Sequence, residues 1–232
     1  MSTYYFLPTR NVFGMGAVTE AGDLMKSLGG SKTLIVTDKF LAQCGMAGRV
    51  ADILSKAGIQ AEIFPGAEPN PTDLNVAAGV TAYREHGCDS ILSLGGGSSH
   101  DCAKGIGMVA ASGGSIHDYE GVDRSTKPLM PLMAVNTTAG TASEITRFCI
   151  ITDTRRKVKM AIVDWRVTPQ IAINDPELMK GMPPALTAAT GMDALTHAVE
   201  AYIGNSTTHG TRENALQAVK LIFENLDTAV ET

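Results

Sequence analysis

The sequence predicts an α/β fold with a mostly parallel sheet, followed by a shorter helical domain. Three observations support this prediction. Short apolar runs alternate with segments of helical periodicity, and many of the 24 glycines lie where an apolar run ends. After Pro183 the strand-like runs stop and two amphipathic segments follow. Strands that alternate with helices are typical of βαβ units in a parallel sheet.

Local sequence patterns predict the individual strands and helices along the chain. Apolar, β-branched runs predict strands at 33–37, 60–64, 89–94 and 129–135, with further strand-like runs at 148–153, 159–164 and 170–174. Apolar residues at helical spacing predict helices at 47–57, 74–86, 101–111, 184–203 and 211–230. The change of character near Gly181–Pro184 divides the chain into domains at 1–182 and 183–232.

Composition excludes several classes of protein. Apolar residues make up 44% of the chain and charged residues 19%, which is typical of a globular protein with a core. The 19 basic and 24 acidic residues form no basic cluster, so we expect no nucleic-acid partner. No apolar run reaches the ~18 residues of a membrane span, and the N-terminus lacks the pattern of a secretion signal. The scattered cysteines predict reduced thiols and a cytoplasmic protein; they are Cys44, Cys88, Cys102 and Cys149.

The segment 95–101 (GGGSSHD) follows a predicted buried strand and leads into a helix. Glycines let backbone N–H groups approach an anion, and a helix N-terminus presents such groups with a favourable dipole. The segment therefore predicts a pyrophosphate site, with Ser98 as a further donor and Asp101 at the N-cap or in the first helical turn. The alternative is a tight turn without a ligand. The spacing is not the GxGxxG fingerprint, which argues against an ordinary Rossmann domain.

Two other segments place polar side chains after predicted strands. Asp38 ends the first strand, where a carboxylate can accept from ribose hydroxyls and repel a 2′-phosphate. Its alternative role is to cap the next helix. Residues 136–144 (NTTAGTASE) gather small hydroxyl side chains around a glycine. That pattern fits contacts to a ribose or phosphate, and equally a capping turn.

The segment 191–197 (GMDALTH) carries the sharpest chemical pattern. Asp193 and His197 are i and i+4 on a predicted helix, so they share one face. A carboxylate oxygen beside an imidazole nitrogen supplies half of a divalent metal site. The alternative is a solvated surface pair. A different stripe of this helix is free to face the core: Leu195, Val199 and Tyr202.

Together these segments resemble the iron-containing (group III, metal-dependent) alcohol dehydrogenase family. The stretches that carry the resemblance are 93–107 (SLGGGSSHDCAKGIG), 136–153 (NTTAGTASEITRFCIITD) and 174–203 (NDPELMKGMPPALTAATGMDALTHAVEAYI). It runs from about residue 5 to the C-terminus and is strongest toward ethanol, methanol and 1,3-propanediol dehydrogenases, with lactaldehyde reductase slightly more distant. The resemblance implies a dehydroquinate-synthase-like fold, in which a parallel-sheet NAD-binding domain precedes an all-helical metal-binding domain and the substrate lies in the cleft between them.

The resemblance also implies roles for individual residues. Asp38 would select NAD and Asn70 would line the cofactor site. Gly97 and Ser98 would hold the pyrophosphate, in a loop shaped by Gly95, Gly96 and Asp101. The nucleotide would contact Thr137, Thr138, Gly140 and Thr141, and its pocket would be completed by Phe148, Lys159 and Leu178. Asp193 and His197 match the first two ligands of Fe(II) or another divalent metal such as Zn.

Family members supply two further histidine ligands from later helices, and this sequence contains no segment that matches them. It therefore reads as the first part of a family member: a fragment, a truncated product, or a chain completed by another polypeptide. The resemblance implies a homo-oligomer that transfers hydride between NAD and a short-chain primary alcohol or aldehyde. Two alternatives stay open, an NAD-binding module without turnover and a same-fold enzyme for another substrate such as a polyol.

Overall fold

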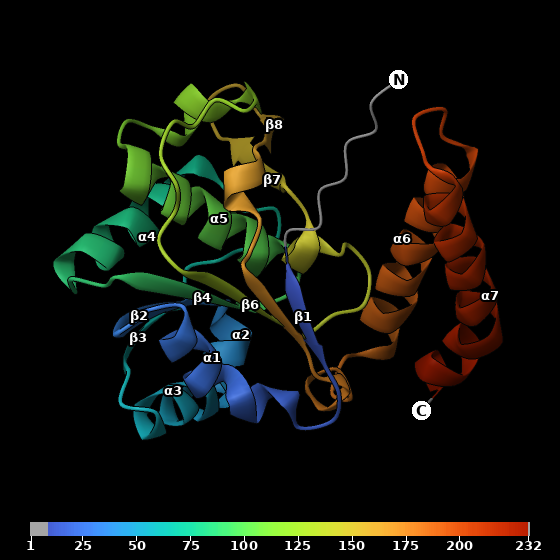
Figure 1. Cartoon of the computed structure of the whole chain (residues 1–232), viewed down its shortest axis with the longest axis horizontal. Helices are drawn as coiled ribbons and strands as arrows, with labels where there is room; N and C mark the ends of the chain where they lie inside the picture. Colours follow the sequence, from blue (N-terminus) through green and yellow to red (C-terminus); the bar gives the residue numbers. More distant parts are fainter. Residues whose placement is uncertain (1–8, 232) are drawn as a thin grey trace. The chain divides into compact units, whose positions relative to one another are not determined.

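A computed structural model describes residues 9–231 (Figure 1). The chain forms two compact units. The first comprises the residues up to Thr137 together with Ser143–Glu177, and the second comprises Thr138–Ala142 together with the residues from Leu178 onward. The boundary expected at 182–183 lies shortly after the start of that last segment.

A six-stranded sheet forms the centre of the first unit. Its strand order is β1-β9-β6-β4-β2-β3, and every neighbouring pair is parallel. The strands are β1 Arg10–Phe13, β2 Lys32–Val36, β3 Gln60–Phe64, β4 Ser90–Gly95, β6 Leu132–Asn136 and β9 Ile171–Asn174. The predicted α/β class is confirmed. Sequence periodicity missed β1, because this four-residue edge strand is largely exposed and has no apolar run.

Helices cover both faces of this sheet, with α4 and α5 on one side and α1 to α3 on the other (Figure 1). They are α1 Ala21–Ser27, α2 Lys39–Gln43, α3 Met46–Lys56, α4 Asp73–Glu85 and α5 Gly97–Ser112. Short 3₁₀ helices are η1 Ala17–Glu20, η2 Ile116–Tyr119, η3 Ser143–Ile145, η4 Trp165–Val167 and η5 Pro176–Leu178. The periodicity predicted α3 and α4 to within a residue, but α5 begins four residues before the predicted start at 101.

A second, three-stranded sheet lies over α5 and was not foreseen as a separate element. Its order is β5-β8-β7, formed by β5 Gly121–Val122, β7 Phe148–Asp153 and β8 Val158–Val163. Strands β7 and β8 pair antiparallel. Their inward side chains join the buried core with Cys102 and Ile106 of α5. All four cysteines are free, as expected.

The second unit contains a pair of long helices, α6 Pro184–Ile203 and α7 His209–Glu231. The helices pack closely at Gly191 of α6. A Cβ atom added there would overlap the side chain of Leu226 of α7. On α6 only Ala198 is buried among the described residues. Of the stripe expected to be free to face a core, Leu195 is partly buried, whereas Val199 and Tyr202 are each 43% exposed in the described chain. The buried residues of the helix pair are Ala198 and Ala215.

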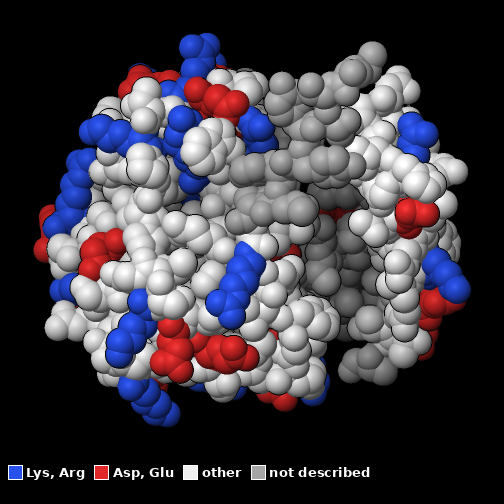
Figure 2. All heavy atoms as spheres, in the orientation of Figure 1, with Lys and Arg blue, Asp and Glu red and all other residues white. Residues whose placement is uncertain are grey.

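Charged side chains of both signs lie close together on the face of the first unit seen in Figure 2. Among the helices that the structure describes, none is long and apolar enough to cross a membrane.

Candidate functional site

The glycine turn after β4 exposes the N-terminus of α5. Gly95 has φ +146°, and a Cβ atom there would lie 2.7 Å from the Cβ of Ser99, so the position requires glycine. Gly96 is the N-cap of α5 and supplies no side-chain cap. The first N–H groups of the helix, including those of Gly97 and Ser98, therefore lack a capping side chain and can donate to an anion.

Asp101 lies elsewhere than predicted. Because α5 begins at Gly97, Asp101 is in the second turn of the helix and is neither its N-cap nor a first-turn acid. Its carboxylate accepts from Ser143 Oγ at 2.7 Å and from the backbone N–H of Ile150 at 3.1 Å. The side chain therefore joins α5 to η3 and β7, behind the loop rather than in it.

A buried lysine completes this junction. The side chain of Lys104 is fully buried, and its Nζ donates to the carbonyl oxygens of Ser143 and Phe148, both at 2.7 Å. Nζ also lies 3.7 Å from Asp101 Oδ1. Burial lowers the pKa of Lys104, and the nearby Asp101 carboxylate opposes that shift. Sequence reasoning missed Lys104, although its i+3 spacing from Asp101 was visible.

A chain of polar side chains, buried except for Asn11 at its end, crosses the sheet beneath the glycine turn. His100 Nδ1 lies 2.7 Å from Ser93 Oγ, and its Nε2 lies 3.4 Å from Asn136 Oδ1. Asn136 donates to Asn174, which donates to Asn11, each at 3.0 Å. Burial and the charge of Lys104 lower the pKa of His100 to about 3, so the imidazole is neutral. These contacts join α5 to β4, β6, β9 and β1.

Asn70 connects the N-terminus of α5 to the small sheet, which carries other predicted cofactor residues of the first unit. The N–H of Asn70 donates to Ser98 Oγ at 3.3 Å, and Thr152 Oγ1 lies 3.4 Å from the Asn70 carbonyl oxygen. Thr152 pairs with Lys159 across β7 and β8. Phe148 begins β7 and is half exposed. The exposed side of the small sheet and the glycine turn are thus linked through Asn70.

Asp38 caps the helix that follows it, which is one of the two roles that the sequence allows. It follows β2 and is the N-cap of α2, where one carboxylate oxygen, Oδ1, accepts from the N–H of Leu41 at 2.8 Å. The side chain is partly exposed. The second oxygen remains able to accept from a ribose hydroxyl.

The remaining predicted nucleotide contacts divide between the units. Thr137 belongs to the first unit, where its N–H donates to the Gly95 carbonyl oxygen at 2.9 Å. Thr138, Gly140 and Thr141 belong to the second unit, as does Leu178. A Cβ atom on Gly140 would lie 2.8 Å from the carbonyl oxygen of Thr190 on α6, so this glycine allows a close backbone approach.

The two predicted metal ligands lie side by side on α6. Asp193 Oδ1 and His197 Nε2 are 3.7 Å apart, and the side chains are 41% and 51% exposed. Two ligand atoms that each lie ~2.1 Å from one ion can be separated by at most ~4.2 Å, so this pair fits two positions of a metal site. Neither residue belongs to a group of three or more metal-ligating side chains in the part of the chain described.

One such group does occur in the first unit, and its members are too far apart in sequence to be predicted. His117 Nε2 lies 3.2 Å from Asp73 Oδ2 and 3.5 Å from Asp153 Oδ2. Arg156 also binds Asp153, and hydrogen bonds from Arg156 hold the pKa of that carboxyl well below its usual range. This network joins α4, η2 and β7.

Comparison with known proteins identifies the family. A family model described as iron-containing alcohol dehydrogenase matches residues 8–176, and one described as the C-terminal part of the Fe-containing alcohol dehydrogenase family matches 187–232. The chain belongs to the iron-containing alcohol dehydrogenase family. The predicted resemblance and the dehydroquinate-synthase-like fold are therefore confirmed.

Individual relatives agree with this assignment. The chain is 51% identical over 228 residues to the NAD-dependent methanol dehydrogenase of Bacillus methanolicus, covering 98% of this chain and 60% of that protein. It is also 51% identical to 1,3-propanediol oxidoreductase of known structure, with a TM-score of 0.96 over all of this chain and 60% of the other. Sulfoacetaldehyde reductase from Bifidobacterium kashiwanohense, solved with NAD⁺, is 33% identical with a TM-score of 0.93, covering all of this chain and 61% of that protein. The chain thus spans about 60% of the length of the relatives it matches.

Proposed function

We propose that this chain is an NAD-dependent alcohol dehydrogenase or aldehyde reductase that acts on a short-chain primary alcohol and its aldehyde. The observation that carries the proposal is the uncapped N-terminus of α5 behind the glycine turn, in a chain that belongs to the iron-containing alcohol dehydrogenase family. Relatives described as NAD-dependent methanol dehydrogenase and 1,3-propanediol oxidoreductase support this substrate class.

The first unit would bind the dinucleotide. Backbone N–H groups of Gly97 and Ser98 would donate to the pyrophosphate, because the N-terminus of a helix attracts anions. The free oxygen of Asp38 would accept from the ribose and repel a 2′-phosphate, which favours NAD over NADP. Asn70, Phe148 and Lys159 would line the same region. Asp101 would act as a positioning residue, since its carboxylate is engaged by Ser143 and Ile150.

Asp193 and His197 would hold a divalent metal, for which Fe(II) is proposed from the family and Zn is a chemically similar alternative. When bound, the metal would supply a Lewis acid for the oxygen of the alcohol or aldehyde, and the nicotinamide would supply the hydride acceptor or donor. The protein residues would fix where these groups lie. The remaining proposed nucleotide contacts are Thr137, Thr138, Gly140, Thr141 and Leu178. A homo-oligomer, a cytoplasmic location and the lack of a nucleic-acid partner also stay predictions.

A second candidate function is NAD binding without turnover. It is favoured by one observation, that the described residues bring only two metal ligands together on α6. The rival proposal of a polyol dehydrogenase has no such observation in its favour.

The test uses the full chain, purified without oxygen and supplied with Fe(II). NADH formation from NAD and 1-propanol is measured for the wild type, His197→Ala and the matched control His209→Ala. His209 also pairs with an acidic residue at i+4, Glu213, at 3.2 Å. We expect turnover that His197→Ala abolishes and His209→Ala preserves. NAD binding without turnover supports the second candidate, and failure to bind NAD contradicts both.

A second variant tests the role of Asp38. Asp38→Ser retains a side-chain oxygen to cap α2 but removes the charge and the second acceptor. We expect the affinity for NAD to fall about tenfold, since hydrogen bonds to charged groups contribute ~1.5–3 kcal/mol, and the affinity for NADP to rise. Calorimetric titration with both dinucleotides measures this, with Asp52→Ser as the surface control. Unchanged affinities would mean that Asp38 only caps the helix.

A further inference from the structure

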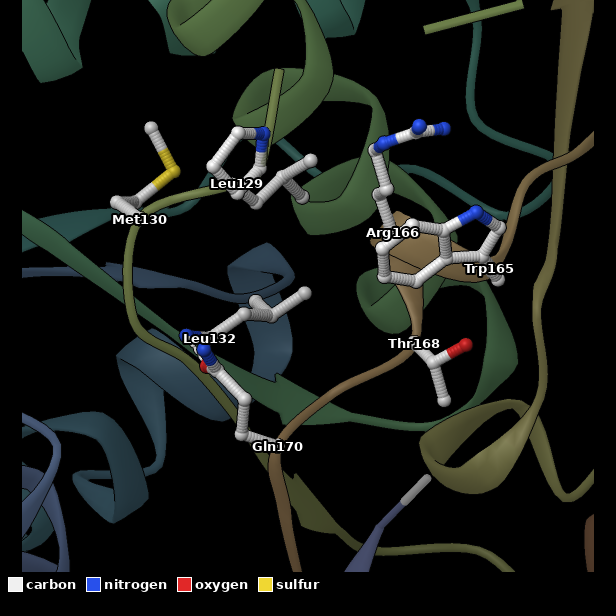
Figure 3. Close-up of a pocket in the computed structure, with 8 residues that line it drawn as sticks. Leu129, Met130, Leu132, Trp165, Arg166, Thr168 and Gln170 are labelled. Carbon is white, nitrogen blue, oxygen red and sulfur yellow. Dashed lines mark hydrogen bonds between the residues drawn. The ribbon is translucent and has the colours of Figure 1, made fainter. Parts of the chain in front are cut away.

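A cavity opens at the amino-terminal edge of the six-stranded sheet. Its volume is about 230 Å³, and it lies beside Leu132, the first residue of β6, and Gln170, which precedes β9 (Figure 3). Gly95 and Asn136 end their strands at the opposite edge. The cavity is therefore separate from the residues proposed to bind NAD, and all of its lining belongs to the first unit.

The cavity has two unlike sides. Leu129, Met130 and Leu132 lie on one side, while Trp165 and Arg166 lie on the other (Figure 3). Leu129 packs closely against Gly107 of α5: a Cβ atom added at that glycine would lie 2.9 Å from Cδ2 of Leu129. Trp165 is 47% exposed, so part of the indole ring is open to a ligand. An apolar wall opposite an indole suits a planar ring.

The Arg166 guanidinium gives the cavity a positive charge. Its Cζ lies over the Trp165 ring, 4.5 Å from the ring centre, which is a cation–π contact. One of its N–H groups faces Asp164 Oδ1 at 3.4 Å. The structure gives the guanidinium no other hydrogen bond among the described residues, so donors remain for a second anion.

Asp164 forms an ion pair with Arg166 but is also hydrogen-bonded to other groups. Its Oδ2 accepts from the N–H and the hydroxyl of Ser125, at 2.9 and 2.7 Å, and its Oδ1 accepts from the backbone N–H of Arg166 at 3.0 Å. The carboxylate charge is thus shared among several donors. Thr168, which also lines the cavity, is buried, and its hydroxyl oxygen lacks a partner among the described residues.

From this geometry we infer that the cavity binds a small aryl carboxylate. The ring would lie between Leu129 and Trp165, and the carboxylate would accept from Arg166, which suits planar carboxylates. The volume of 230 Å³ is below the ~300–1,000 Å³ typical of drug-sized ligand pockets. A single ring therefore matches the cavity better than a dinucleotide.

The sequence provides a direct probe, because Trp165 is its only tryptophan. The full chain is titrated with benzoate while tryptophan fluorescence is recorded, and saturation-transfer NMR on benzoate gives a second readout. We expect saturable binding, at least tenfold weaker binding of the uncharged benzyl alcohol, and no displacement of benzoate by excess NAD. Arg166→Gln should weaken benzoate binding at least tenfold, whereas the exposed control Arg155→Gln should not.

Non-saturating titrations, equal binding of benzoate and benzyl alcohol, or displacement by NAD would each overturn the inference. If circular dichroism shows that Arg166→Gln is unfolded, the benzoate and benzyl alcohol titrations of the wild type decide alone. The result does not depend on the proposed dehydrogenase activity, because neither readout requires turnover.

Discussion

Two long helices, α5 in the first unit and α6 in the second, each carry residues with a proposed binding role, and they differ in how deeply their side chains are buried. α5 has ten buried residues, from Ser99 to Val109, and among them are an ionisable lysine and a histidine. α6 is longer, yet only Ala198 is buried among its described residues. The proposed pyrophosphate site is therefore built on a tightly packed helix, and the proposed metal ligands on an exposed one.

Burial decides how much a polar side chain contributes to stability in the two helices. In α5, the buried side chains of His100 and Lys104 are hydrogen-bonded to the sheet, η3 and β7, so they fix the position of the glycine turn. On α6, Asp193 and His197 are exposed and bind little else in the described chain. We therefore expect substitutions in α5 to change stability, and equivalent substitutions in α6 or α7 to change it little.

The largest effect is expected at Lys104. Lys104→Met keeps most of the side-chain volume but leaves the Asp101 carboxylate without its buried cation. Removing one partner of a buried ion pair costs about 3–5 kcal/mol. Urea denaturation followed by Trp165 fluorescence, which reports on the first unit, should show this loss.

The matched control is Lys220→Met on α7. Lys220 pairs with Glu224 at 3.8 Å and is 72% exposed. Exposed pairs contribute only ~0–1 kcal/mol, so we expect almost no change in urea denaturation followed by circular dichroism. Equal losses of stability in Lys104→Met and Lys220→Met would contradict the expected difference between the buried and the exposed ion pair.

The next effect is a pH dependence at His100. Its pKa falls from an ordinary value of 6.5 to about 3 in the folded chain, because of burial and Lys104. The unfolded state therefore binds a proton that the folded state does not, and stability is lost as pH falls below 6.5. The slope is about 1.4 kcal/mol per pH unit, or ~2 kcal/mol between pH 6.5 and pH 5.

Urea denaturation at a series of pH values tests this expectation. His100→Asn should flatten the dependence between pH 6.5 and pH 5, whatever it does to stability at neutral pH. His209→Asn is the exposed control and should leave the slope unchanged, since His209 is 88% exposed. A wild-type slope that survives in His100→Asn would mean that other groups cause it.

The fold was largely predictable because most elements have a strong hydrophobic period. The central strands β2, β4 and β6 are almost entirely buried, so they read as apolar runs. The start of α5 was misplaced because Gly97 and Ser98 resemble a loop, whereas here they begin a helix whose N-terminus stays free. The short β1, α1 and α2 have too few residues for a period to emerge.

The site was predictable only where its residues are neighbours in sequence. The glycine turn and the pair Asp193 and His197 are local patterns. Lys104 and Ser143 meet through the packing of α5 against η3, and the chain from His100 to Asn11 crosses four strands. No local spacing encodes such contacts, because they depend on strand order. The family resemblance supplied the proposed nucleotide contacts that the local patterns did not.

The smallest effect is expected at two glycines, one in α5 and one in α6. A Cβ atom at Gly105 of α5 would lie 2.9 Å from Cγ2 of the buried Val76, which is β-branched and cannot rotate away. Overpacking costs ~1–3 kcal/mol and alanine's helix propensity returns up to ~1, so Gly105→Ala should lose about 1 kcal/mol. In Gly191→Ala the flexible, partly exposed Leu226 can move, so the helix gain should offset the clash and leave stability almost unchanged. Thermal unfolding by circular dichroism measures both, and a larger loss at Gly191 would mean that α6 is held as tightly as α5.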